Sequence, residues 1–387
     1  MSSSIIWIGM DVHKDTVMVA VYTDDAREPE IVQQLPNDPR KLKRFFQRWG
    51  RRGEIRSCYE ASGAGYVLQR EITEWGHDCE IVAPSLIPSR PGERQKHDRK
   101  DATQLARLYR AGELVTIRIP SAAEERVRDL VRCRQCFQRE ILRSRHYVTK
   151  FLARRGLVYR EGTNWTRRHR SWLQSLFQQG GLEPEDRSVF SEYLALLDYK
   201  ISRREDLDGQ IEKLAFSPAY KPKIDRLRCF RGVDTLAAMT LVTEIGDWRR
   251  FERPGQLMAY LGLVPSEYSS GDREHRGPIT KAGNSRCRHV LVQAAWKYKH
   301  RPAVSVDLKK RQSGQLPQAI AHAWKAQHHL HKLFHRIAAR KSSRIAVVAA
   351  ARELVGLPLG RDAGIRNRTG GHPQHGRLKT KGGPEAR

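Results

Sequence analysis

Four acidic residues have the types and spacing that metal-assisted chemistry on phosphate esters requires. Asp11 and Glu60 each end an apolar run, while Asp98 and Asp101 lie three positions apart. Two divalent ions that bridge the attacking and leaving oxygens assist in-line cleavage or transfer of a phosphodiester, and Mg²⁺ prefers hard carboxylate oxygens. Since the chain has 71 Lys and Arg against 43 Asp and Glu, acids are scarce in it. The cluster therefore predicts a site that holds metal ions against nucleic-acid phosphates.

Apolar runs predict five strands in the first ~110 residues, with helices between them. Asp11 and Glu60 end two of these strands, and Asp98 and Asp101 open a helix. Residues three apart on a helix face the same way, and acids that end neighbouring strands can point at one spot. Residues 37–39 (NDP) have the cap-and-proline signature of a helix start. The predicted strands are 5–11, 17–22, 31–35, 55–60 and 79–83, and the predicted helices are 41–49, 62–75 and 98–111.

The order of these acids, strand Asp, strand Glu and helical Asp-x-x-Asp, favours an α/β domain with an RNase H-like, nuclease-type site. Taken singly, each acid has an ordinary explanation: Asp98 can cap a helix, and Glu60 can pair with a nearby arginine. An actin-like ATPase fold also places an Asp in its first hairpin, but it needs a Gly/Thr-rich phosphate loop there. The connection at 12–16 (VHKDT) has no glycine run, which disfavours that fold.

The charge of the chain indicates its partners. A formal charge of +28 and a pI near 10.2 predict salt-dependent binding to DNA or RNA phosphates. No apolar stretch approaches the ~20 residues of a membrane-spanning helix, and no signal peptide is visible at the first residues. We expect a soluble, intracellular protein without a membrane partner.

Six cysteines are expected to be free thiols in a reducing compartment. Cys133 and Cys136 have the spacing of zinc ligands, but no second such pair or paired histidines follow at a workable distance. They also fall in a helical pattern, so a zinc site is disfavoured and the role of these two thiols stays open.

The rest of the chain reads as helical. Long apolar periodicities at 122–156 and 185–216 predict an antiparallel, coiled-coil-like arm, which would dimerise or hold two domains apart. Beyond it, residues 230–246 predict helix, turn, helix, and the turn at Gly232 can offer backbone N–H groups to a phosphate. Further helices are predicted at 286–295, 318–339 and 344–354. The tail at 358–387 is basic, glycine-rich and non-periodic, which predicts disorder.

Several of these segments resemble one known family. Residues 9–14 (GMDVHK), 60–66 (EASGAGY) and 98–102 (DRKDA) resemble the RuvC-like half of the DEDD transposases of bacterial insertion sequences of the one-hundred-and-ten family, and of the related Piv-type DNA invertases. Residues 260–271 (YLGLVPSEYSSG) and 279–284 (ITKAGN) are similar to the family's C-terminal transposase domain.

The resemblance spans residues 5–355, in the family's order and spacing. It implies an α/β plus all-α architecture in four parts. These are an RNase H-like (RuvC-like) metal domain at 1–118, a helical coiled-coil arm at 119–220, a mainly helical transposase domain with a serine loop at 221–357, and the basic tail at 358–387.

The resemblance further implies a recombinase in which Ser270 is the nucleophile that becomes linked to DNA. A covalent phosphoserine conserves the energy of the broken bond until the strands are rejoined. Gly271 permits a tight backbone that exposes the hydroxyl, and Arg273, Arg276 and Lys281 can bind phosphate and stabilise developing charge. Chemistry alone does not separate Ser270 from Ser269, but the alignment on Tyr-x-Ser-Gly favours Ser270.

Cofactor and partners follow from the same resemblance. Asp11, Glu60, Asp98 and Asp101 would bind Mg²⁺, as two ions for which Mn²⁺ can substitute. The partners implied are donor and target DNA, an element-encoded noncoding guide RNA, and further copies of this chain, as a dimer and then a tetramer on DNA. Because the acids and Ser270 fall in different domains, a composite site would form by folding back or between protomers. The location implied is the bacterial cytoplasm, with nucleoid association during activity.

Two other functions remain open on the sequence. One is a RuvC-like structure-specific nuclease, in which water attacks, Ser270 is idle and no protein–DNA adduct forms. The other is a non-catalytic nucleic-acid-binding protein, whose DNA binding would be unchanged when the acids are replaced. The presence of all four acids and the Ser-Gly pair argues against the second.

Overall fold

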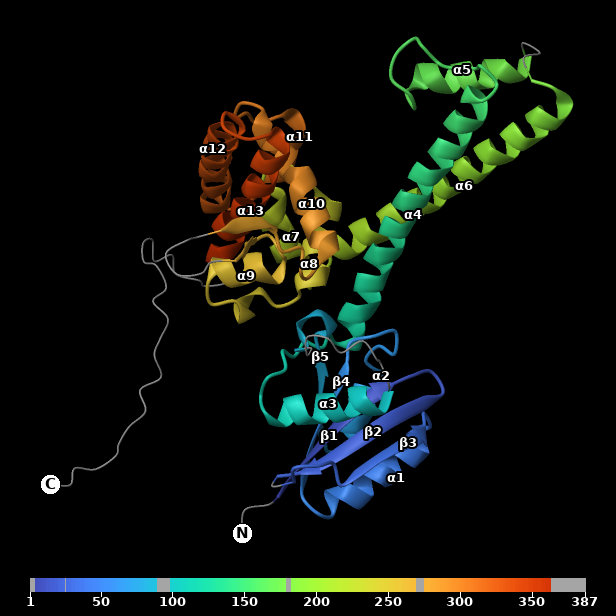
Figure 1. The fold of residues 1–387 in the computed structure, drawn as a ribbon. Helices are drawn as coiled ribbons and strands as arrows, with labels where there is room; N and C mark the ends of the chain where they lie inside the picture. Colours follow the sequence, from blue (N-terminus) through green and yellow to red (C-terminus); the bar gives the residue numbers. More distant parts are fainter. Residues whose placement is uncertain (1–3, 25, 89–97, 179–181, 269–274, 363–387) are drawn as a thin grey trace. The chain divides into compact units, whose positions relative to one another are not determined.

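The computed structural model describes residues 4–24, 26–88, 98–178, 182–268 and 275–362 of the chain (Figure 1). The chain divides into two compact units, Met1–Ser121 and Ala122–Arg387. The first is α/β and the second is mainly helical. Among the described residues, no helix has both the length and the apolar character that crossing a membrane requires.

The first unit is built on a five-stranded sheet in the order β3-β2-β1-β4-β5. β1 pairs antiparallel with β2 and parallel with β4, while β3 and β5 form the two edges. All five strands predicted from the apolar runs are confirmed, each within one residue at either end. Their bounds are β1 Ile5–Val12, β2 Thr16–Thr23, β3 Ile31–Pro36, β4 Glu54–Glu60 and β5 Asp78–Val82.

Helices cover both faces of this sheet. α1 (Pro39–Gly50) and α2 (Val67–Glu74) pack on one face, where Phe46 and Ile72 are fully buried against β1 and β4. α1 begins where the sequence predicts, because Asp38 accepts hydrogen bonds from the backbone N–H groups of Arg40 and Lys41. α2 begins five residues later than the predicted start at 62, since residues 62–66 form a turn with Gly65 at φ 67°.

Among the described residues of this unit, α3 (Asp98–Arg110) is the one helix on the opposite face, and it lies very close to β1 (Figure 1). Ala102 and Ala106 are fully buried in this contact. A Cβ at Gly9 would lie 2.3 Å from both the carbonyl oxygen of Ala102 and the backbone nitrogen of Ala106. Trp7 meets Tyr109 edge to face at 5.3 Å. α3 therefore runs antiparallel to β1, and its first turn lies where β1 ends.

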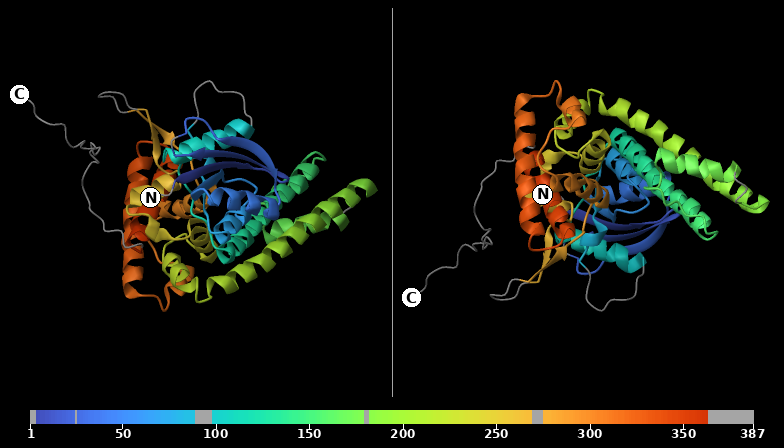
Figure 2. Two further views of the ribbon diagram at one scale, coloured as in Figure 1. Left: turned by 90° about the horizontal axis from the view of Figure 1, so that it is seen from below. Right: turned by 90° about the horizontal axis from the view of Figure 1, so that it is seen from above.

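In the second unit, two helices of 32 residues each, α4 (Ala122–Ala153) and α6 (Pro184–Ala215), pack along one another (Figure 2). Arg134 bonds Asp208, Lys200 bonds Ser144, and Phe151 stacks on Phe190. As positions rise along α4 they fall along α6, so the pair is antiparallel. α5 (Arg167–Gln178) joins their far ends.

The remainder of the second unit surrounds the largest buried core of the described residues. α8 (Thr235–Ile245) is buried at the centre of this core, and α13 (Ser343–Asp362) packs against α9 (Pro254–Tyr260), α10 (Ser285–Ala295) and α12 (Pro317–Ala338). α13 continues through 358–362, which the sequence assigns to the tail; residues 363–387 lie outside the described residues. The elements are α7 Lys221–Arg228, α8 Thr235–Ile245, α9 Pro254–Tyr260, β6 Pro265–Glu267, β7 Arg276–Ile279, α10 Ser285–Ala295, α11 Val306–Gln312, α12 Pro317–Ala338 and α13 Ser343–Asp362.

Substitution of Gly9 tests the packing of α3 on β1. We expect Gly9→Ala to destabilise the first unit by ~1–3 kcal/mol, because the added methyl group overlaps helix backbone that must then move. Hydrogen exchange should report faster opening of β1 and α3. Because the chain forms two compact units, a single unfolding transition of the whole protein would not report the stability of the first unit alone. Gly63→Ala is the matched control, since nothing lies within 4 Å of a Cβ there; equal protection in both variants would contradict the prediction.

Candidate functional site

Sheet register places Asp11 and Glu60 at the same end of neighbouring strands. β1 and β4 are parallel with Met10 opposite Tyr59, so Asp11 and Glu60 are the next residues along. Met10 and Tyr59 are fully buried on the face under α1 and α2. Since side chains alternate along a strand, Asp11 and Glu60 both belong to the face that α3 covers. Both are partly exposed.

The first turn of α3 brings Asp98 to Asp11. Asp11, His13 and Asp98 each offer a ligand atom, and these three atoms all lie within 4.8 Å of one another. The Nε2 atom of His13 is 3.3 Å from Oδ2 of Asp11 and 3.5 Å from Oδ2 of Asp98. The side chain of Asp11 is 21% exposed and that of Asp98 57% exposed, so the cluster is accessible to solvent.

Glu60 and Asp101 are not part of this three-residue cluster. Asp101 precedes Leu105 by one helical turn, and Leu105 packs against Cys58 of β4. Asp101 therefore lies on the side of α3 that faces β4, whose last residue is Glu60. The structure thus groups two of the four predicted acids tightly and leaves the other two at the same end of the sheet.

His13 is the site residue that sequence reasoning missed. It follows Asp11 by two positions in the β1–β2 hairpin, and its backbone is fixed there by the bond from its N–H to the Thr16 carbonyl and by the side chain of Asn37. Residues two apart on an extended chain have side chains on the same side. The two-residue spacing between Asp11 and His13 is the sequence feature that could have indicated His13 as a site residue. An imidazole between two carboxylates can neutralise them or offer nitrogen to a metal.

The donor chemistry of this end of the sheet fits a divalent cation. Carboxylate oxygens from two strands and one helix are the hard ligands that Mg²⁺ and Mn²⁺ prefer, and a single imidazole is compatible with them. The six cysteines are free, and Cys133 and Cys136 are exposed on α4. Within the described ranges, no possible metal-ligand group other than Asp11, His13 and Asp98 is found.

The residues predicted around the serine loop are only partly described. Ser270, Gly271 and Arg273 lie outside the described residues, as does Ser269. Arg276 opens β7 and is exposed, and Lys281 is exposed with φ 55°.

The two sequence motifs on either side of this loop contact one another through their backbones. Lys281 donates its N–H to the carbonyl of Gly262. A Cβ at Gly262 would lie 2.0 Å from the carbonyl oxygen of Ala282, and one at Gly283 would lie 2.0 Å from that of Tyr260. Arg288 donates to the carbonyls of Leu261 and Gly283 and holds the crossing in place.

A buried carboxylate ties three helices of the second unit together. Glu244 on α8, with a side chain only 1% exposed, accepts two hydrogen bonds from Arg132 on α4 at 2.7 and 2.8 Å. Asn284, the N-cap of α10, donates to it at 2.7 Å, and Arg286 lies 3.5 Å away. Burial acts to raise the pKa of Glu244, but Arg132, Asn284 and Arg286 outweigh it and hold that pKa below its usual value of 4.5.

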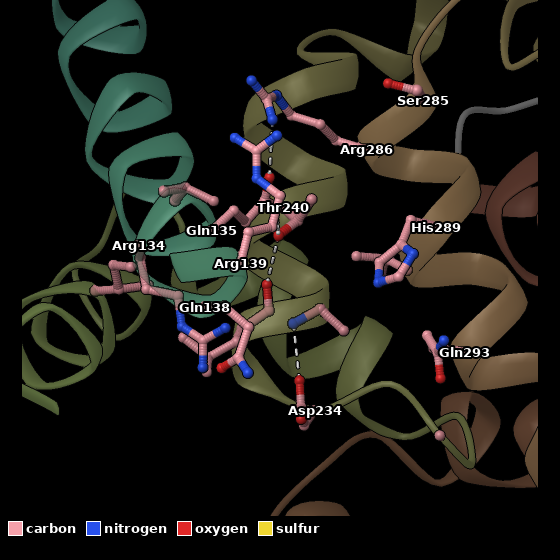
Figure 3. A pocket seen from close by; sticks show the side chains of 16 residues that line it. Arg134, Gln135, Gln138, Arg139, Asp234, Thr240, Ser285, Arg286, His289 and Gln293 are labelled. Carbon is pink, nitrogen blue, oxygen red and sulfur yellow. Dashed lines mark hydrogen bonds between the residues drawn. The ribbon is translucent and has the colours of Figure 1, made fainter. Parts of the chain in front are cut away.

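Beside this network is a pocket of about 430 Å³ between α4, α8 and α10 (Figure 3). Its charged lining is mostly basic, from Arg134, Arg139 and Arg286, and Gln135 bonds Thr240 across it. Asp234 caps α8 by accepting from the N–H of Ala237. A carboxylate at this helix start repels phosphate, so the structure does not favour the phosphate-binding turn suggested for Gly232.

Comparisons with known proteins agree with this arrangement. A DEDD transposase family of IS110 elements, described as "Transposase", matches residues 8–155. The family described as "Transposase IS116/IS110/IS902 family" matches residues 224–305. The two matches cover the metal-ligand cluster and the part of the second unit on both sides of the serine loop.

Individual relatives extend over most of the chain. The "Transposase for insertion sequence element IS1533" of Leptospira borgpetersenii is 31% identical over 340 residues, which cover 86% of this chain and 96% of that protein. The protein y4qE of Sinorhizobium fredii, also named as a transposase, is 40% identical over 305 residues, 78% of this chain and 73% of its own. The "Transposase for insertion sequence element IS1111A" of Coxiella burnetii is 24% identical over 241 residues.

An α/β unit with acids at one end of its sheet, followed by a helical unit that matches transposases, defines the chain as a transposase of an insertion sequence. It belongs to the IS110 family of DEDD transposases. Members of this family use divalent metal ions, for which the cluster at Asp11, His13 and Asp98 is the candidate site.

Neutral substitutions test the metal-ligand cluster. We expect Asp11→Asn and Asp98→Asn each to weaken binding of Mn²⁺ by about tenfold or more, because even partners that only orient metal ligands contribute 10–100-fold. Calorimetric titration or the electron paramagnetic resonance of free Mn²⁺ would measure this. Asp78→Asn removes the same charge at the opposite end of the sheet; an equal loss there would indicate nonspecific attraction.

The lowered pKa of Glu244 predicts how stability depends on pH. The unfolded chain binds the proton more tightly than the folded one, so the stabilisation is present above the usual pKa of 4.5 and is lost as pH falls through the lower folded value. Glu244→Gln should destabilise the second unit by ~1.5–3 kcal/mol near neutral pH, because it removes the buried negative charge that accepts hydrogen bonds from Arg132 and Asn284, and Arg132 is itself partly exposed to solvent.

The difference between wild type and Glu244→Gln should shrink as the pH of urea unfolding is lowered below 4.5. Glu252→Gln, at an exposed position, is the control and should change little at any pH. A gap between wild type and Glu244→Gln that stays constant across this range would contradict the assignment.

Proposed function

We propose that this transposase cuts and rejoins DNA at specific sites by phosphodiester transesterification, with the acidic end of the sheet as its metal centre and a serine as its nucleophile. The observation that carries the proposal is the convergence of Asp11, His13 and Asp98 from a strand, a hairpin and a helix in a chain of this family. Side chains from two separate segments, the β1–β2 hairpin and α3, meet there in a protein whose excess charge favours polyanionic partners.

Asp11 and Asp98, with Glu60 and Asp101 at the same end of the sheet, would hold Mg²⁺, as two ions for which Mn²⁺ can substitute. Bound Mg²⁺ supplies positive charge that stabilises the attacking and leaving oxygens of a phosphodiester. The sheet contributes rigidity, because Asp11 and Glu60 are fixed by strand register and Asp98 by the packing of α3. His13 lies between the two aspartates, where its imidazole nitrogen is placed as a further possible ligand.

Ser270 is the proposed nucleophile. Its hydroxyl oxygen would lose a proton and form a bond to phosphorus, while the P–O bond that joins this phosphate to one side of the DNA strand breaks. The leaving DNA oxygen would gain a proton. The phosphoserine stores the bond for rejoining. Support comes from the family membership and from exposed cations near Ser270 in the sequence, Arg276 and Lys281, which can bind phosphate oxygens.

Donor and target DNA are the proposed substrates, and an element-encoded noncoding RNA is the proposed guide, in the bacterial nucleoid. The basic charge of the chain suits either nucleic acid. The acids and Ser270 belong to separate parts of the sequence. We therefore propose that copies of this chain assemble on DNA as a dimer and then a tetramer, in which both kinds of residue act on one phosphodiester.

A metal-dependent nuclease that uses water is the second candidate. It is favoured by one observation, that the metal-ligand cluster lies wholly within the first unit. In that case the acids would suffice for cleavage, Ser270 would be idle, and DNA ends would be released free of protein.

A search for a covalent protein–DNA adduct separates the two. Purified protein would be incubated with Mg²⁺, the element's noncoding RNA and DNA that carries the element's junction, and the products run on a denaturing gel. We expect an adduct with wild type and with Ser269→Ala, and none with Ser270→Ala or Asp11→Ala, since attack needs both nucleophile and metal centre. Cleavage without an adduct that survives Ser270→Ala but not Asp11→Ala would establish the nuclease instead.

A further inference from the structure

A groove of about 850 Å³ lies between the β6–β7 hairpin and the helices α12 and α13 of the second unit. Its floor is apolar, with Leu263, Ile279, Ile337 and Val348 among the residues that form it. None of the described residues that line it is acidic, and six are cations. These six are Arg276, Arg336, Arg340, Lys341, Arg344 and Arg352.

We propose that this cationic groove binds the phosphodiester backbone of DNA. Five of its six cations are arginines, whose planar guanidinium groups pair with two phosphate oxygens at once. The apolar floor suits the sugar edges of a strand whose phosphates face the walls. A second copy of this chain is a poorer occupant, since it also carries a formal charge of +28.

Helix electrostatics supply an independent argument. Cations after the last turn of α12 complement the negative end of that helix, which gives Arg340 and Lys341 an ordinary structural explanation. Arg344 has the opposite setting, in the first turn of α13, where the helix end is positive and no acid compensates it. A cation there opposes helix stability, and a bound anion would remove that penalty.

Three of the six groove cations are left available by the fold. Within the described part of the chain, no ion pair is found for Arg336, Arg340 or Arg344, and all three are exposed. Ile345, beside Arg344, is an apolar side chain that is 51% exposed. An exposed apolar residue among unneutralised arginines is expected where a partner, rather than the protein itself, covers both.

The choice of DNA over RNA rests on the proposed function. β6 and β7 form two sides of the segment that contains Ser270 in the sequence, and β7 begins with Arg276, a groove residue. A strand held in the groove would thus contact β7, which follows, in the sequence, the segment proposed to attack it.

The first test measures how DNA binding depends on salt. Full-length protein carrying Ser270→Ala, which cannot form the proposed adduct, would be titrated with a duplex that spans one end of the element. In this background, adding Arg340→Gln and Arg344→Gln should reduce the slope of log Kobs against log salt by about 0.9 for each lost phosphate contact.

The matched control removes two exposed cations of α11, Lys309→Gln and Lys310→Gln, which do not line the groove. It should leave the slope nearly unchanged. An equal reduction in both double variants, or none in either, would overturn the proposal, because the binding would then not involve this groove.

The second test compares the effect of replacing Arg344 on the stability of α13 with its effect on DNA affinity, which are expected to be opposite. Arg344→Glu places an acid in the first turn of α13, so the hydrogen-exchange protection of α13 should stay the same or rise while affinity for the duplex falls. Weaker hydrogen-exchange protection of α13 together with unchanged DNA affinity would show that Arg344 has a structural role only, and would contradict the argument from helix electrostatics.

The third test identifies the occupant. A photoreactive benzoylphenylalanine at Ile345 should cross-link to the DNA strand, while the same group at Val306, which is 72% exposed on α11, should not. A cross-link to the noncoding RNA or to a second copy of the chain would refute the assignment to DNA. These three tests measure binding, stability and cross-linking and do not require DNA cleavage. If they fail, the serine mechanism is not contradicted, and if no covalent adduct forms, DNA binding in the groove is not contradicted.

Discussion

The arrangement of the metal-ligand cluster depends on how closely α3 can approach β1. Gly9 has no side chain, and Ala102 and Ala106 are small, so helix backbone lies directly on the strand. Because α3 runs antiparallel to β1, this contact brings the start of the helix to the end of the strand. Asp98 then meets Asp11 across His13. A larger residue at Gly9 would separate the two carboxylates although it touches neither.

A different constraint organises the second unit. There a buried carboxylate, Glu244, is surrounded by donors from α4 and α10, and its negative charge is stable only because Arg132, Asn284 and Arg286 supply hydrogen bonds and positive charge. The network fixes one end of the long helical pair to the core that carries the β6–β7 hairpin. Acids are few in this chain, and this one is used to hold helices together rather than to bind metal.

The two uses of charge are therefore separate in the structure. Exposed acids gather at one end of the sheet, while a groove of the second unit is lined by cations that include Arg336, Arg340 and Arg344, for which the described residues show no ion pair. At the acidic end of the sheet and in the groove, the protein holds charged side chains that its own residues do not fully neutralise. Like charges held close together destabilise a protein that has no ligand for them, which is why such places are expected to be where ions and nucleic acid bind.

The sequence by itself determined the local structure and the family. Apolar runs specified all five strands of the sheet, because strand formation follows the burial of alternating or continuous apolar residues, and Asp38 before Pro39 specified the start of α1. The sequence also identified Asp11 and Asp98 as candidate ligands, and the short motifs around them were sufficient to indicate the DEDD transposases.

Only the tertiary structure decided which side chains meet. His13 joined the cluster because hairpin geometry and α3 packing place its ring between two aspartates, and its residue type alone did not indicate that. The partners of Glu244 come from positions 132, 284 and 286, and the groove gathers residues from 263 to 352. Contacts over such separations depend on how helices pack in three dimensions, and the periodicity of a single segment carries no information about the segment it will pack against.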